Sequence, residues 1–308
     1  MAERCLAAER GRLGQRDGMA AGPSNDEIMA AINESGYLME QEVATRLEQR
    51  GFHVRTNVAF EDPDESKSRE IDVVAVKRTS FDEAAKLSAY VELLVECKNS
   101  ANPFVFIARP KNPSDRHHSP EEFLFPYRYE MKKDLGPGKG MTRQVKAFHH
   151  LGFDQVFKAH VRPWKAVQFC RIDRKGSGWH ANHGGLYDAI FYPMAKALNA
   201  RRKEVPKASR PDEWRYTWLF FPLVVTSGDL FLIDATADQP SPVGVDHVSF
   251  QRELKSGKLS GSFMVTFVRQ QALESFLADV VDPLAALSAD LIEQRQDFLK
   301  TTVLPWAD

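Results

Sequence analysis

The stretch Ala89-Tyr90-Val91-Glu92-Leu93-Leu94-Val95-Glu96-Cys97-Lys98 decides the fold that we expect for this chain. Its apolar run predicts a buried strand, and alternation along that strand places Glu96 and Lys98 on one face. A carboxylate and an ammonium at the end of a hydrophobic strand are costly to desolvate, so another group must offset that cost. The upstream stretch Arg69-Glu70-Ile71-Asp72-Val73-Val74-Ala75-Val76 predicts a second acidic strand. Asp72 and Glu96 together would line a hard, oxygen-rich site suited to Mg²⁺, with Lys98 beside it.

Size and composition are those of an ordinary globular protein. The 308 residues suffice for one large domain or two modest ones, and 43% of them are hydrophobic and 27% charged. The net charge of −1 gives no overall attraction for nucleic acid, so such a partner must be held by a local patch. No apolar run is long enough to span a membrane. Cys5, Cys97 and Cys170 are too widely spaced for a disulfide framework or a metal knuckle, and we expect a reducing compartment, the cytoplasm.

Helical signals precede the first strand. Ser24-Asn25-Asp26-Glu27 predicts a helix start, with a capping side chain followed by acids. Apolar spacing continues the helical pattern to Leu47, with an interruption near Ser35-Gly36, and Gly51 ends it as a left-handed cap. The residues from Phe52 to Phe60 then predict a first strand.

The organisation along the chain predicts three segments. Residues 1–25 lack periodicity, and we expect a disordered N-terminal extension. Residues 26–235 form the main domain, in which residues 109–140 are an irregular insertion rich in Pro, Gly, His and charge. A hairpin is expected around Ser227-Gly228-Asp229. Residues 236–308 predict a β-hairpin and a helical extension that pack on the same domain.

Helix, strand, strand with Asp72 and strand with Glu96-Cys97-Lys98 follow one another in this order along the chain. This order resembles the PD-(D/E)XK nuclease superfamily, in its Mrr-like and Holliday-junction-resolvase-like branch. The resemblance covers residues 26–151. It implies an α/β protein with a restriction endonuclease-like core, in which helices flank a mixed central β-sheet, and with extra C-terminal strands and helices.

The family's first helix carries a glutamate, which is the position of Glu40 in Gly36-Tyr37-Leu38-Met39-Glu40-Gln41-Glu42, with Glu42 as the alternative. Several members also place a Gln on a following helix, and Gln144 fits on a helix that we expect from Thr142 to His150. The chain departs from the family pattern in the long insertion before Gln144. Glu65-Ser66-Lys67 repeats the Glu-x-Lys spacing in a polar turn without an apolar strand, and we expect no site there.

The resemblance implies five catalytic residues and a divalent metal ion. Asp72 and Glu96 would bind Mg²⁺ or Mn²⁺ together with the carbonyl of Cys97, and Glu40 would hold a second ion or a nearby water. Lys98 would position the attacking water and offset charge on the phosphate, while Gln144 would orient phosphate or water. The implied activity is that of an endonuclease that hydrolyses DNA phosphodiester bonds, in restriction, phage defence or repair.

Basic residues interleaved with aromatic ones follow the acidic motif. Such clusters bind backbone phosphate without reading sequence. The contacts expected for nucleic acid are Arg109, Lys111, Lys132, Lys133, Arg143 and Lys146. The pair His180 and His183 superficially suggests a metal site, but the flanking glycines predict a loop, and no acidic or Cys ligands accompany the pair.

Other interpretations stay open. Asp72, Glu96 and Lys98 would also suit a structural salt-bridge cluster on a half-exposed sheet face. The protein would then be a catalytically inactive nuclease-like module that binds nucleic acid or a partner protein. RNA is an alternative substrate to DNA, because the chemistry at phosphorus would be the same. A homodimer is a further expectation, because nucleases of this type often pair to cut both strands.

Overall fold

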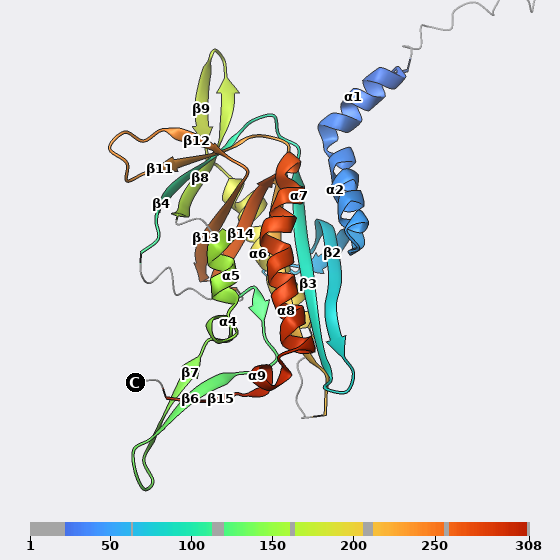
Figure 1. Ribbon diagram of the computed structural model, residues 1–308. Helices are drawn as coiled ribbons and strands as arrows, with labels where there is room; N and C mark the ends of the chain where they lie inside the picture. Colours follow the sequence, from blue (N-terminus) through green and yellow to red (C-terminus); the bar gives the residue numbers. More distant parts are fainter. Residues whose placement is uncertain are drawn as a thin grey trace, which may run out of the picture.

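A large mixed β-sheet runs through the protein, with helices against both of its faces (Figure 1). The computed structural model describes residues 22–62, 64–112, 120–160, 164–205, 212–255 and 259–306, so most of the expected N-terminal extension lies outside the described residues. The strands are β1 (His53–Glu61), β2 (Ser68–Asp82), β3 (Leu87–Lys98), β4 (Phe104–Pro110), β5 (Phe123–Leu124), β6 (Tyr129–Asp134), β7 (Gly140–Val145), β8 (Trp164–Lys175), β9 (Gly178–Asn182), β10 (Arg215–Thr226), β11 (Leu230–Asp234), β12 (Pro242–Val245), β13 (His247–Lys255), β14 (Ser260–Arg269) and β15 (Val303–Pro305).

The strand order of the main sheet is β1-β2-β3-β10-β14-β13-β8-β4-β11-β12, while β5 pairs with β10 and β9 with β8. Neighbours are antiparallel from β1 to β3 and parallel from β3 through β10 to β14. A separate sheet has the order β15-β6-β7. The α/β class that the sequence predicts is therefore confirmed, and the sheet is a mixed one.

Helices cover both faces of this sheet and give the protein two cores. They are α1 (Asn25–Ser35), α2 (Tyr37–Gln49), α4 (Ala147–His150), α5 (Phe153–His160), a π-helical turn (Tyr187–Phe191), α6 (Tyr192–Glu204), a 3₁₀ turn (Gln270–Ala272), α7 (Leu273–Phe276), a second π-helical turn (Leu277–Val281), α8 (Asp282–Glu293) and α9 (Gln296–Lys300). Leu93 of β3 packs in one core with Leu47 of α2 and Leu284 of α8, and Leu94 packs in the other with Leu198 of α6. β3 is thus buried on both faces, which explains its near-continuous apolar sequence.

The local signals before β1 are confirmed. The side chain of Ser24 accepts a hydrogen bond from the backbone N–H of Glu27, whose carboxylate accepts one from the N–H of Ser24, so α1 begins with a capping box. Gly36 separates α1 from α2 in a left-handed conformation with φ of 86°. Gly51, with φ of 80°, ends the second helix as expected.

The hairpin expected around Ser227-Gly228-Asp229 is wrong, although both of its strands exist. β10 lies between β3 and β14, whereas β11 pairs with β4 and β12. β10 has an almost wholly buried sequence, so it occupies a central position that is covered on both faces. An isolated hairpin would have left much of that apolar surface in water.

The expected insertion at 109–140 is more ordered than its composition indicates. It contains β5, β6 and the first residue of β7, while residues 113–119 lie outside the described residues. The hairpin expected near the C-terminus is confirmed as β13 and β14, which are inner strands of the main sheet between β10 and β8. Strands from both sides of the expected boundary at residue 235 therefore belong to one sheet.

Candidate active site

The start of α2 is held against the end of β3. A Cβ atom at Gly36 would lie 3.3 Å from the Cβ atom of Asn99, and the side-chain amide of Asn99 donates a hydrogen bond of 2.5 Å to the carbonyl of Asn33. Asn99 directly follows Lys98, and Glu40 is one turn into α2. The glycine thus allows the close approach that brings Glu40 to the end of β3.

Asp72, Glu96 and Lys98 lie just beyond the last registered pair of the β2–β3 ladder, Val73 with Val95. One carboxylate oxygen of Asp72 accepts a hydrogen bond of 2.7 Å from the backbone N–H of Cys97, so the Asp72 side chain bridges the two strands. The ammonium of Lys98 lies 2.6 Å from one carboxylate oxygen of Glu96. The Glu96 side chain is 15% exposed and that of Lys98 is 32% exposed, so the pair is reachable from solvent.

Burial raises the pKa of each of the three carboxyl groups, and neighbouring charges add to the shift of Glu40 and Glu96. Burial raises the pKa of Glu40, and the negative charges of Asp72 and Glu96 raise it further, while Lys98 offsets part of the effect. Burial also raises the pKa of Glu96. The charge of Lys98 lowers it, and the negative charge of Asp72 raises it. Burial raises the pKa of Asp72, although the hydrogen bond from the backbone N–H of Cys97 lowers it in part. We call Glu40, Asp72, Glu96 and Lys98 the carboxylate site.

The side chain of Cys97 behaves as an apolar neighbour of the carboxylate site. It packs against the core that contains Leu93 and Val95, as the alternation along β3 predicts. Burial, followed by the charge of Asp72, raises the pKa of the Cys97 thiol far above its ordinary value. Cys97 and Cys170 are both free, and Cys5 lies outside the described residues.

The carboxylate of Glu42 binds residues outside the carboxylate site. Its carboxylate pairs with Arg46 one turn later and accepts a hydrogen bond of 2.7 Å from the side-chain amide of Gln270. Of the two glutamates that the sequence offers on this helix, we assign Glu40 to the carboxylate site, because the charges of Asp72 and Glu96 raise its pKa.

The helix expected around Gln144 is wrong. Gln144 lies on β7, opposite Glu130 of β6, and the helix begins only at Ala147. The β6–β7 hairpin is at the bottom of Figure 1, whereas β3 leads into β4 at the top, so the structure does not bring Gln144 to the carboxylate site. The β6–β7 hairpin is favoured over a helix because β15, from the C-terminal end of the chain, pairs with β6 and completes a sheet of three strands.

The expected basic contacts are also distant from the carboxylate site. Lys132, Lys133, Arg143 and Lys146 lie on or directly after the β6–β7 hairpin, and Lys132 pairs with Glu130 at 2.8 Å. Arg109 and Lys111 lie at the far end of β4. The cluster exists in part, but it does not flank the carboxylates.

Sequence reasoning missed the β8–β9 hairpin, where a loop was expected around His180. This hairpin stands at the top of Figure 1. Its base joins the segment after Lys98, because the side-chain amide of Asn102 donates a hydrogen bond of 2.9 Å to Asp173. Near its tip, Trp179 is 61% exposed, with the guanidinium of Arg174 5.9 Å from its ring centroid. The glycine-containing turn between two alternating stretches was the available signal.

Within the described ranges, no three His, Cys, Asp or Glu side chains lie close enough together to hold one metal ion. In the same part of the chain, no helix has both the length and the apolar character needed to cross a membrane. Comparisons with protein-family models, with curated proteins and with solved structures find no match. The interpretation of this chain therefore rests on its own geometry.

Proposed function

We propose that this protein is a metal-dependent nuclease with a restriction endonuclease-like core, which hydrolyses phosphodiester bonds of DNA. The observation that carries this proposal is that Asp72 from β2 and Glu96 from β3 lie at one end of the two strands beside Lys98, with Glu40 of α2 near enough for their charges to raise its pKa. Side chains that converge from three separate elements and have perturbed pKa values are typical of active sites.

Two carboxylates and one backbone carbonyl would supply oxygen ligands to a divalent metal ion. The charges of Asp72 and Glu96 raise the pKa of Glu40, and the charge of Asp72 raises that of Glu96, while Lys98 lowers both. Carboxylate and carbonyl oxygens are the ligands that Mg²⁺ and Mn²⁺ prefer. Asp72 and Glu96 would hold the ion together with the carbonyl of Cys97. A bound ion would neutralise charge on the phosphate and make water more acidic.

The other side chains would act on water and phosphate. Its raised pKa makes the Glu40 carboxylate a stronger base, so it would orient the attacking water and accept a proton from it. Lys98, whose ammonium pairs with Glu96, would exchange that bond for one to the phosphate, where its charge would stabilise the transition state.

The β8–β9 hairpin is the surface that we assign to DNA. It combines the exposed ring of Trp179 with Arg174, which can stack on a base and neutralise phosphate. The hydrogen bond from Asn102 to Asp173 links the base of this hairpin to the segment that leaves the carboxylate site. A strand held along the hairpin would be directed toward that end of β3.

The test uses supercoiled plasmid and single-stranded DNA with Mg²⁺, Mn²⁺ or EDTA. We expect metal-dependent cutting by the wild type and by Lys67→Ala, and none by Lys98→Ala. Lys67 is a matched control because it belongs to the other Glu-x-Lys sequence and its side chain is 74% exposed. Equal cutting by Lys98→Ala and the wild type would overturn the assignment of the site.

A binding measurement separates the nuclease from a catalytically inactive nuclease-like module. At 100 times its dissociation constant, Mn²⁺ should stabilise the wild type by about 2.7 kcal/mol, a rise in Tm of roughly 4 °C for a chain of this size. Asp72→Asn should lose that rise, and Glu42→Gln should keep it. DNA binding without cutting and without a metal-dependent Tm would favour the inactive module.

A further inference from the structure

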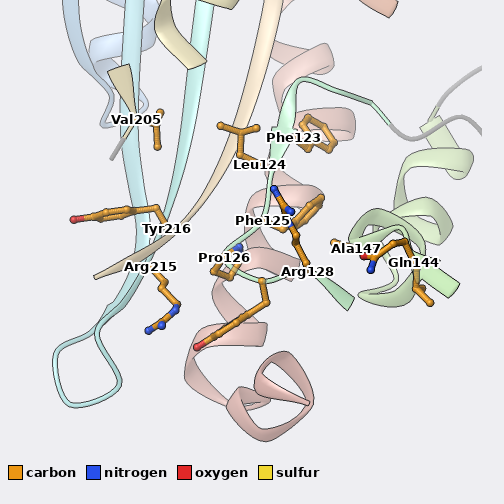
Figure 2. A pocket seen from close by; sticks show the side chains of 12 residues that line it. Phe123, Leu124, Phe125, Pro126, Arg128, Gln144, Ala147, Val205, Arg215 and Tyr216 are labelled. Atoms are coloured by element: carbon orange, nitrogen blue, oxygen red, sulfur yellow. The ribbon is translucent and has the colours of Figure 1, made fainter. Parts of the chain in front are cut away.

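A cavity lies where the loop from β5 to β6, the end of β7 and the first residues of β10 meet (Figure 2). Its volume is about 460 Å³, within the range of roughly 300–1,000 Å³ that small organic ligands occupy. Gln144 lines this cavity, although the sequence suggested that it belongs to the carboxylate site. No residue of the carboxylate site lines the cavity.

The charge of the cavity lining selects an anion. Among the described residues that line it, Arg128 and Arg215 are charged and no Asp or Glu accompanies them. Arg128 is exposed, and the guanidinium of Arg215 lies 5.3 Å from the ring centroid of Tyr127. Guanidinium groups bind phosphate through two parallel hydrogen bonds, and stacking on an aromatic ring fixes their plane.

The rest of the lining suits a flat aromatic group. Figure 2 shows Tyr216 on one side, Phe125 and Pro126 in the middle and Gln144 on the other side. Aromatic side chains stack on nucleic-acid bases irrespective of the base, because every base presents a π-face. The amide of Gln144 has both donors and an acceptor, which the edge of a base requires.

We propose that this cavity binds a nucleoside phosphate, with the base against the aromatic rings and the phosphate on Arg128 and Arg215. A free nucleotide and one nucleotide of a single strand present the same chemistry, so the cavity accepts either. This site goes beyond the nuclease proposed above, and it stands without it, because binding here uses neither a metal ion nor any carboxylate of the other site.

The test measures binding to the full chain in EDTA, in the Lys98→Ala background, so that cutting cannot enter the readout. The probes are adenosine monophosphate, adenosine, inorganic phosphate and a labelled ten-nucleotide oligo-dA. We expect the monophosphate or the oligonucleotide to bind at least about tenfold more tightly than adenosine or phosphate alone. Binding of the monophosphate identifies a site for free nucleotides, and binding of the oligonucleotide alone identifies a site for one nucleotide of a strand.

Variants decide whether this cavity is responsible. Arg128→Ala should weaken binding about tenfold or more. The affinity of Arg128→Lys should lie between those of Arg128→Ala and the parent protein, because lysine keeps the positive charge but cannot donate two parallel hydrogen bonds to the phosphate. Lys139→Ala, at an exposed position of the β6–β7 turn, is the matched control and should change affinity less than twofold. Equal Tm values for all variants establish that each is folded. Binding of no probe, or equal binding by Arg128→Ala and its parent, would overturn the proposal.

Discussion

Gly228, at the end of β10, packs against the backbone of the segment that leaves the carboxylate site. A Cβ atom added at Gly228 would lie 2.5 Å from the carbonyl oxygen of Ser100 and 2.9 Å from that of Asn102, whereas ordinary contact begins at 3.4 Å. Both atoms belong to the backbone, so no side-chain rotation can relieve the clash. The segment after Lys98 must retreat by most of an ångström.

We therefore expect Gly228→Ala to destabilise the protein by the usual cost of overpacking, about 1–3 kcal/mol. For a chain of this size this corresponds to a loss in Tm of roughly 2–5 °C. The control is Gly244→Ala in β12, where an added Cβ meets nothing within 4 Å and φ is not in the left-handed region. That substitution should be neutral or stabilising by up to about 1 kcal/mol.

Thermal and urea unfolding of both variants measure these differences directly. If Gly228→Ala unfolds within 1 °C of Gly244→Ala, the contact between β10 and the segment after Lys98 is not as tight as described. A second readout is the Mn²⁺-dependent rise in Tm, which should shrink in Gly228→Ala because the displaced segment is continuous with Cys97, whose carbonyl we assign to the ion.

Three further predictions concern Glu40, Arg201 and Trp179. An acid whose pKa is raised in the fold lowers stability when it is ionised. Glu40→Gln should therefore raise Tm at about pH 7 and lose that advantage near pH 4, where the Glu40 carboxyl of the wild type is also protonated. Arg201→Ala should cost about 3–5 kcal/mol in urea unfolding, because it leaves the carboxylate of Glu92, which is 0% exposed, without the hydrogen bonds of 2.6 and 3.1 Å that it accepts. Replacing both partners by Met should recover most of that loss. Trp179→Ala should weaken single-stranded DNA binding by about 1–3 kcal/mol without changing Tm, as a fluorescence titration can measure.

The part of the fold nearest the N-terminus could be predicted because its signals are local. The capping box at Ser24, the left-handed Gly36 and Gly51, and the alternation through Glu96 depend on neighbours in sequence. The two successive acidic stretches, with Asp72 and Glu96, predicted adjacent strands, and β2 and β3 are paired. These residues needed no distant partner to be recognised.

The errors arose where distant partners decide the structure. Gln144 precedes a plausible helical pattern, but pairing of β6 with β15, more than 150 residues later, favours a sheet. The sequence predicted β10 as half of a hairpin, but in the structure β3 and β14 pair with its two edges. The cavity at Arg128 combines residues 123–128 and 144–147 with residues 205, 215 and 216, so no short window of sequence could show it.

The parallel pairing of β3 with β10 joins Leu87 to Arg215 and Lys98 to Thr226 without a break. During synthesis, β3 is therefore made long before the strand that covers one of its edges. Until residue 226 leaves the ribosome, that apolar edge stays open, and such edges are where growing chains aggregate. Contacts of this sequence separation also slow folding. We conclude that the strand carrying Glu96 and Lys98 is completed only after residue 226 has been made, and that its open edge is accessible to chaperones until then.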